Sequence, residues 1–148
     1  DLPKIWILPN NDAGSNIIKS NVLKKRTNDI FIFDNVNREK YLYLLKHASC
    51  IVGNSSSGII EAPTFGVPCV NVGRRQNKRL RAKNVIDVLN YDAVKISRAI
   101  KRAISKDFKR KLINLENPYG DGNSSNKIVE YLLNTKRDKK LFFKEITY

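Results

Sequence analysis

Short apolar runs alternate with helical patterns along most of this chain. The apolar runs lie at residues 5–8, 30–33, 50–52, 68–72 and 84–88. Helical spacing of apolar residues is found at residues 15–27, 38–47, 58–65, 93–104, 108–115 and from 124 onward. Strands that alternate with helices across short connections are typical of a parallel sheet with helices on both faces. We therefore predict an α/β fold with a Rossmann-like domain, whose first strand is buried on both faces.

The length of the chain favours one domain. A chain of 148 residues, of which 41% are hydrophobic, is long enough to bury one core and short for two. We therefore predict a single domain over residues 1–134. Four side chains of its last helix are expected to point inward: Ile128, Val129, Leu132 and Leu133. The basic segment 135–148 is expected to be a tail or a docking segment.

Features that the chain lacks exclude several kinds of protein. No apolar run approaches the roughly 20 residues of a membrane-spanning helix, and the first residues lack the pattern of a secretory signal. We therefore expect a soluble, cytoplasmic protein without a membrane partner. Cys50, Cys69 and the single His47 form neither the spacing of a tetrahedral zinc site nor a disulfide framework. We expect no metal and no cofactor.

The formal net charge of +14 indicates an anionic partner, such as nucleic acid, a membrane surface or a phosphorylated small molecule. Most of the cations lie in runs that fit solvated helix faces or the tail. One group differs because it directly follows a predicted strand, where ligands gather in open α/β sheets. This group consists of Arg74, Arg75, Lys78, Arg79 and Arg81. The segment that contains it, residues 73–84, is here called the basic loop.

The segment Gly53-Asn54-Ser55-Ser56-Ser57-Gly58, here called the serine-rich turn, joins a predicted strand to a predicted helix. A helix start presents unpaired N–H groups and partial positive charge, which together favour an anion. Small residues let a diphosphate approach the backbone, serine hydroxyls add uncharged donors, and Gly58 lets the chain bend. Serine and glycine are also the ordinary residues of a capped turn, and composition alone favours that plainer interpretation.

Three further polar groups are expected to meet at this turn. Glu61 follows in the same predicted helix, where a carboxylate either complements the helix dipole or accepts both hydroxyls of a ribose. Arg75 follows the next strand and can pair with phosphate in bidentate fashion. Asn10 follows the first strand, where its amide either donates to a ligand or fixes its own loop. Three strand ends thus converge on one crevice suited to a nucleotide.

Six segments together form a pattern that covers nearly the whole chain. Three lie around the turn: Gly53-Asn54-Ser55-Ser56-Ser57-Gly58-Ile59-Ile60-Glu61-Ala62-Pro63, Phe65-Gly66-Val67-Pro68 and Arg75-Gln76. The others are Pro9-Asn10-Asn11-Asp12-Ala13-Gly14-Ser15, Asn84-Val85-Ile86-Asp87-Val88 and Asn117-Pro118-Tyr119-Gly120-Asp121-Gly122. With these segments the chain resembles the UDP-N-acetylglucosamine 2-epimerases. The Gly-Asn-Ser-Ser form resembles their hydrolysing branch, which serves sialic acid pathways.

The resemblance implies two Rossmann-like domains of the glycosyltransferase-B type, with the substrate between them and this chain as the C-terminal one. It implies that UDP is bound by Asn10, Ser55, Ser56, Glu61 and Arg75. The serines would hold the diphosphate and Glu61 the ribose, and support is expected from Ser57, Gly58 and Gln76. The family eliminates UDP to give a 2-acetamidoglucal, and its hydrolysing branch adds water to release N-acetylmannosamine. The full-length family members also imply a homo-oligomer.

The carboxylates that act as acid and base in that family belong to its first domain, and its functional histidine lies upstream of the Pro-Asn-Asn-Asp segment. The resemblance therefore implies no catalytic residue in this chain. We expect it to bind UDP or a UDP-sugar, to need the missing N-terminal domain and to be inactive alone. Asn16 stands where the animal bifunctional enzymes have a lysine that helps bind a feedback inhibitor, so the same feedback control is not expected.

Two other functions compete with this one. A UDP-sugar glycosyltransferase would build its nucleotide site in the same way, but the spacing from the serine-rich turn to Arg75-Gln76 favours the epimerase. A basic nucleic-acid-binding module is suggested only by the net charge. The chain lacks the stacking aromatic residues, interleaved with cations, that are typical of such modules.

Overall fold

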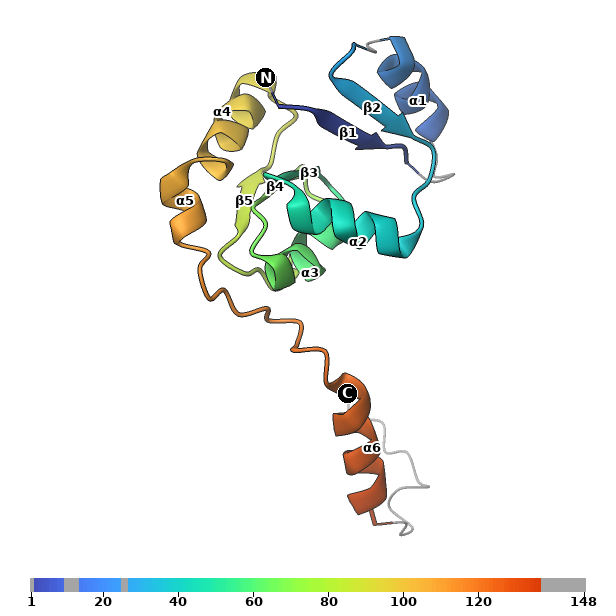
Figure 1. Cartoon of the computed structure of the whole chain (residues 1–148), viewed down its shortest axis with the longest axis vertical. Coiled ribbons are helices and arrows are strands. Elements are labelled where there is room, and N and C mark those ends of the chain that lie inside the picture. The colour runs from blue at the N-terminus through green and yellow to red at the C-terminus, as the bar shows by residue number, and fades with distance from the viewer. Residues whose placement is uncertain (1, 10–13, 25–26, 137–148) are drawn as a thin grey trace, which may run out of the picture. The chain divides into compact units, whose positions relative to one another are not determined.

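The computed structural model describes residues 2–9, 14–24 and 27–136 (Figure 1). The chain divides into two compact units, Asp1–Ala48 and Ser49–Tyr148. Each unit combines helices with strands that pair in parallel. The predicted α/β class is therefore confirmed, and the strands form one sheet of two and one of three.

The first unit contains two strands and two helices. Strand β1, Lys4–Ile7, pairs in parallel with β2, Ile30–Phe33. Helix α1 spans Ser15–Lys24, and helix α2 spans Arg38–His47. Helix α2 begins at a side-chain cap, because Oδ1 of Asn37 accepts the backbone N–H of Lys40 at 2.9 Å. This cap explains why the predicted start of the helix is correct.

The prediction that the first strand is buried on both faces is wrong. All four residues of β1 are exposed, including Ile5, Trp6 and Ile7. A two-stranded sheet in a unit of this size has too little surrounding structure to cover both faces of a strand. An apolar sequence allows a strand to be buried. Whether it is buried depends on a second layer of helices or strands that covers it.

The second unit has a three-stranded parallel sheet in the order β3-β4-β5 (Figure 1). The strands are β3, Ile51–Gly53, β4, Cys69–Val72, and β5, Val85–Val88. Helix α4, Ala93–Ala103, packs on β4 and β5, and the short helix α5, Lys106–Arg110, follows it. The buried centre of this unit consists of Val70, Val88, Ala99 and Ala103.

The predicted helix over residues 58–65 is two short pieces. Helix α3 spans Ser57–Ile60, and a 3₁₀ turn, η1, spans Ala62–Phe65. Pro63 gives the physical reason, because proline has no N–H to donate and its ring hinders the preceding helical turn. Gly66 ends the segment in the left-handed conformation that the sequence predicts, with φ 62°. The single long helix dipole expected behind the serine-rich turn is therefore absent.

Helix α6, Ser124–Asn134, begins where the sequence predicts, but it has no buried residue. The four side chains expected to point inward are exposed by 55–80%: Ile128, Val129, Leu132 and Leu133. An apolar helix face is buried only where another layer covers it, and the described residues provide none for this one.

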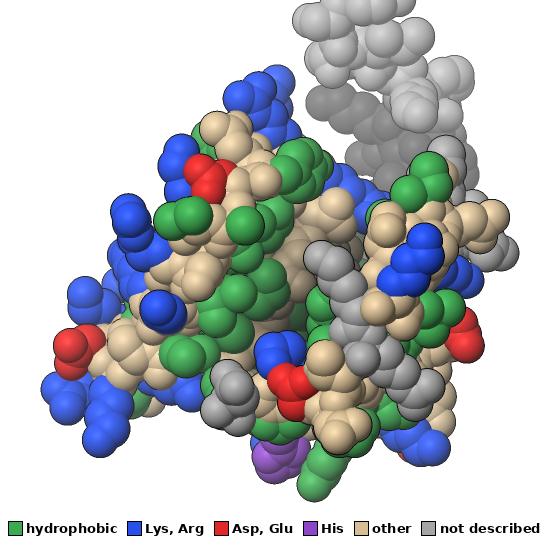
Figure 2. Space-filling model, turned by 90° about the horizontal axis from the view of Figure 1, so that it is seen from above, with side chains coloured by type: hydrophobic (Ala, Val, Ile, Leu, Met, Phe, Trp, Pro, Cys, Tyr) green, Lys and Arg blue, Asp and Glu red, His purple; other side chains and the backbone are tan. Residues whose placement is uncertain are grey.

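The Lys and Arg side chains lie at the surface in separate groups on the face shown in Figure 2.

The structure was also searched for membrane-spanning helices and for metal sites, within the described residues only. None of their helices combines the length and the apolar character that crossing a membrane requires. Likewise, the part of the chain that the structure describes contains no group of three or more His, Cys, Asp or Glu side chains placed to hold a metal ion.

Candidate functional site

The serine-rich turn leaves the sheet at the carboxyl end of β3. Gly53, the last residue of this strand, pairs with Asn71 of β4. Its φ of 148° is a conformation that residues with a side chain rarely adopt, which explains a glycine at this exit. Because β4 is the parallel neighbour of β3, the basic loop leaves the sheet at the same edge. The sheet thus brings two of the three predicted strand ends side by side.

The three serines of the turn differ in what they contact. Oγ of Ser55 accepts the backbone N–H of Ser57 at 3.3 Å, which folds the turn on itself. Ser56 precedes α3 without making a side-chain cap. Among the described residues, no group accepts the backbone N–H of Ser55 or Ser56, and the hydroxyl of Ser56 makes no hydrogen bond. The turn therefore presents two backbone donors and one hydroxyl to a ligand.

Gly58 has a different role from the one expected. It is buried, and a β-carbon at this position would lie 2.4 Å from Sγ of Cys69. Its φ is not in the left-handed region, so no bend of the chain requires glycine here. Gly58 is needed because helix α3 approaches β4 closely, which fixes the turn against the sheet.

Glu61 is half-buried and lies at the C-terminal end of α3. It does not lie at the start of α3, as the dipole interpretation expected, and it is also the residue that precedes η1. One of its oxygens, Oε2, accepts the hydroxyl of Ser57 at 2.6 Å. This bond orients the carboxylate, and the hydroxyl of Ser57 is committed to it as a donor. Ser57 is therefore a support for Glu61.

The basic loop is tied directly to the serine-rich turn. Nε2 of Gln76 donates to the backbone carbonyl of Asn54 at 2.8 Å, and the Gln76 residue is only 3% exposed. Its neighbour Arg75 is exposed. Arg74 and Arg75 form no ion pair with any residue that the structure describes. Their positive charge is therefore available to an anion beside the turn.

Arg81 is the one residue of the basic group that is half-buried. Its Nε lies 2.8 Å from Oδ2 of Asp87, and the two side chains are 24% and 33% exposed. Sequence reasoning missed this pair. The sequence of β5 contains a sign of this ion pair, because Asp87 interrupts the apolar residues Val85, Ile86 and Val88. A carboxylate in a sheet strand needs a cation or hydrogen-bond donors nearby.

The remaining predicted residue, Asn10, lies outside the described residues. In the second unit the structure brings together the serine-rich turn with Ser55, Ser56 and Ser57, the carboxylate of Glu61, and the part of the basic loop that contains Gln76. This arrangement combines backbone N–H groups, a hydroxyl, an oriented carboxylate and arginines. Such a set can hold a phosphorylated ligand that also carries hydroxyl groups.

Comparison with known proteins identifies the family of the chain. The sequence pattern of the UDP-N-acetylglucosamine 2-epimerase family matches residues 1–133. A UDP-N-acetylglucosamine 2-epimerase of Neisseria meningitidis is 44% identical over 101 residues, which are 68% of this chain and 26% of that protein. A GDP/UDP-N,N'-diacetylbacillosamine 2-epimerase (hydrolyzing) of Campylobacter jejuni is 43% identical over 118 residues, which are 80% of this chain and 30% of that protein.

The fold also has a solved counterpart. The crystal structure of the UDP-GlcNAc 2-epimerase from Neisseria meningitidis, bound to UDP-GlcNAc, superimposes with a TM-score of 0.67 at 22% identity. The match covers 89% of this chain and 36% of that one. The chain thus spans about a third or less of the length of these relatives. Because the family pattern extends over nearly all of its residues, the chain belongs to the UDP-N-acetylglucosamine 2-epimerase family.

Proposed function

We propose that this chain is the nucleotide-binding C-terminal domain of a hydrolysing UDP-N-acetylglucosamine 2-epimerase. The complete enzyme would convert UDP-N-acetylglucosamine into N-acetylmannosamine and UDP, as a step toward sialic acid. Loss of the C2 proton of the sugar and departure of UDP from C1 form a 2-acetamidoglucal. Addition of water across its double bond then gives the product. The Gly-Asn-Ser-Ser form of the turn and the hydrolysing relative from Campylobacter jejuni support this branch.

One observation carries the proposal. The serine-rich turn offers the N–H groups of Ser55 and Ser56 and the hydroxyl of Ser56, none of which has a partner among the described residues. Arg75 lies in a loop that a hydrogen bond joins to the same turn. Unused donors beside an unpaired arginine favour a phosphate-containing ligand.

In this proposal the two serines and Arg75 hold the diphosphate, and Glu61 accepts the ribose hydroxyls. The hydroxyl of Ser57 donates to Oε2 of Glu61 and thereby helps to orient this carboxylate. Asn10 would contact the nucleotide from the preceding segment. The task of this chain is to stabilise the leaving group, because negative charge grows on the β-phosphate as the C1–O bond breaks. The residues that move protons would lie in a first domain, and the complete enzyme would be a homo-oligomer.

Calorimetric titration with UDP tests the site in the full-length protein that carries this chain. Ser56→Ala and Arg75→Ala each remove a donor to phosphate, so each should raise the Kd for UDP by about tenfold or more. Lys101→Ala removes an exposed cation of α4 and serves as the matched control, with no expected change. Wild-type protein that fails to bind UDP would contradict the proposal, as would variants that bind like wild type.

The hydrolysing branch has its own test. Incubation of the full-length enzyme with UDP-N-acetylglucosamine, followed by NMR spectroscopy, should show free N-acetylmannosamine and UDP in equal amounts. Accumulation of UDP-N-acetylmannosamine would assign the enzyme to the non-hydrolysing branch and leave the nucleotide site unaffected.

A further inference from the structure

The side chain of Gln76 joins two segments that are 22 residues apart in the sequence. It belongs to the basic loop, and its Nε2 donates to the carbonyl of Asn54 in the serine-rich turn at 2.8 Å. The residue is 97% buried, since only 3% of its surface is exposed. Its Nε2 is committed to the protein, and the side chain is shielded from solvent, including Oε1, which has no hydrogen-bond partner among the described residues. Gln76 therefore does not act through direct contact with a ligand.

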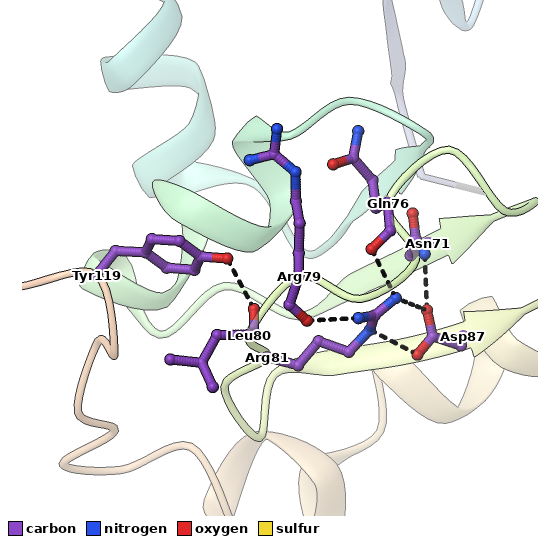
Figure 3. A network of polar contacts seen from close by, with 7 residues as sticks. All are labelled: Asn71, Gln76, Arg79, Leu80, Arg81, Asp87 and Tyr119. Carbon is purple, nitrogen blue, oxygen red and sulfur yellow. Dashed lines mark hydrogen bonds and ion pairs between the residues drawn. The ribbon is translucent and has the colours of Figure 1, made fainter. Parts of the chain in front are cut away.

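Arg81 holds the main chain of Gln76 in place. Its Nη2 donates to the carbonyl of Gln76 at 3.0 Å, and its Nη1 donates to the carbonyl of Arg79 at 2.7 Å (Figure 3). One guanidinium thus binds two carbonyls of the basic loop. In Figure 3 the side chains of Arg79 and Arg81 extend in different directions, so Arg79 takes part in this contact through its carbonyl alone.

Asp87 connects this guanidinium to the sheet. Its Oδ2 lies 2.8 Å from Nε of Arg81, and its Oδ1 accepts Nδ2 of Asn71 at 2.6 Å. Asn71 is 1% exposed and pairs in register with Asp87 on one side and with Gly53 on the other. The polar network therefore begins at Asn71 and Asp87, which lie in register with Gly53, the first residue of the serine-rich turn. It ends at the carbonyl of Asn54, the next residue of that turn.

The distribution of charge separates two kinds of cation in the basic loop. The charge of Arg81 is compensated by its ion pair with Asp87. Arg74 and Arg75 have no ion pair among the described residues and are exposed. Arg81 thus shapes the loop, and Arg75 remains available to a phosphate. Gln76 connects the two parts: its carbonyl accepts a hydrogen bond from Arg81, and its side chain donates one to the serine-rich turn.

We propose that Gln76 is a positioning residue of the nucleotide site, which fixes the distance between Arg75 and the N–H groups of Ser55 and Ser56. The inference rests on the proposed function. A diphosphate is long enough to contact both segments at once, and it binds tightly only if their separation is held in advance. A ligand with a single phosphate depends less on this separation. Gln76 therefore determines the preference for UDP over UMP.

The test compares the affinities for UDP and UMP in the full-length protein by calorimetry. Gln76→Leu keeps a similar volume and removes the donor. We expect its Kd for UDP to rise by about tenfold, which corresponds to about 1.4 kcal/mol, and its Kd for UMP to rise by less than about threefold. The ratio of the two constants is the informative readout, because a general loss of stability would weaken both ligands alike.

Tyr119→Phe is the matched control. The hydroxyl of Tyr119 donates to the carbonyl of Leu80 at 2.9 Å, so this variant also removes one hydrogen bond to the basic loop (Figure 3). This bond does not reach the serine-rich turn, and the UDP/UMP ratio should therefore stay within about twofold of wild type. If Gln76→Leu does not fold, Gln76→Met keeps the unbranched shape of the side chain and also lacks the donor.

The outcomes are distinguishable. Wild-type protein that binds no UDP contradicts the proposed function and this inference together. UDP binding that is lost in Arg75→Ala but unchanged in Gln76→Leu or Gln76→Met overturns the positioning role alone. Equal changes of the UDP/UMP ratio in the Gln76 and Tyr119 variants would also overturn it, because general anchoring of the loop would then be responsible.

Discussion

Gly58 and Cys69 are in such close contact that a β-carbon on residue 58 would lie 2.4 Å from the cysteine sulfur. Gly58→Ala should therefore overpack the junction of α3 and β4 and lower the free energy of unfolding by about 1–3 kcal/mol. Urea denaturation followed by circular dichroism measures this change. Cys69→Ala in the same background removes the sulfur and should recover part of the loss. A Gly58→Ala variant as stable as wild type would show that α3 shifts without cost.

Asn84 joins the same helix to the sheet region from inside the protein. It is fully buried, and its Nδ2 donates to the carbonyls of Gly58 at 3.3 Å and Val67 at 2.9 Å. Asn84→Ala leaves both carbonyls without this donor and creates a small cavity, so we expect a loss of about 2–4 kcal/mol in unfolding free energy. Asn90→Ala, at an exposed position, is the control and should change stability by no more than about 0.5 kcal/mol.

The ion pair of Arg81 and Asp87 should contribute more than the surface pairs of the same chain. A double-mutant cycle with Arg81→Ala and Asp87→Ala is expected to give a coupling energy of about 1 kcal/mol, because the two side chains are only 24% and 33% exposed. The exposed pair of Arg110 and Asp107 provides the comparison, with an expected coupling of about 0.5 kcal/mol or less. Equal coupling energies in the two cycles would refute the structural role of Arg81.

Burial, together with the nearby charge of Asp87, raises the pKa of the Cys69 thiol from its usual 9.0 to about 12. Alkylation by iodoacetamide at pH 8 should therefore leave Cys69 unlabelled in the folded protein and label it in urea, as measured by mass spectrometry. Between pH 9 and about pH 12 the unfolded chain loses this proton while the folded chain keeps it. Stability from this group is thus complete below pH 9 and falls as the pH rises through that range. Rapid labelling of native Cys69 at pH 8 would contradict this expectation.

Local signals predicted much of the fold correctly. Helix α2 has its cap, Asn37, and its apolar spacing within one short segment, and its predicted bounds agree with the structure. The single helix predicted over residues 58–65 is divided into α3 and η1, because Pro63 interrupts the helical hydrogen bonds. The expected burial of β1 and α6 was wrong for another reason, because burial depends on a covering layer that periodicity does not specify.

The candidate site divides in the same way. The serine-rich turn was recognisable because its residues are contiguous and follow an apolar strand. The contact of Gln76 with Asn54 and the pair of Arg81 with Asp87 depend on the register of neighbouring strands. No spacing along the chain distinguishes Arg81, which is paired, from Arg75, which is exposed. Asp87 within an apolar strand was the one local sign that a buried partner existed.

The order β3-β4-β5 has a consequence for how such a site arises during folding. The segments between consecutive strands of this sheet contain the serine-rich turn and the basic loop, so each is also a crossover that lets parallel strands pair. Pairing β4 with both neighbours therefore draws the two segments together in the same event. Assembly of the sheet therefore also assembles the candidate site, and a mispaired β5 would leave Arg81 of the basic loop without Asp87.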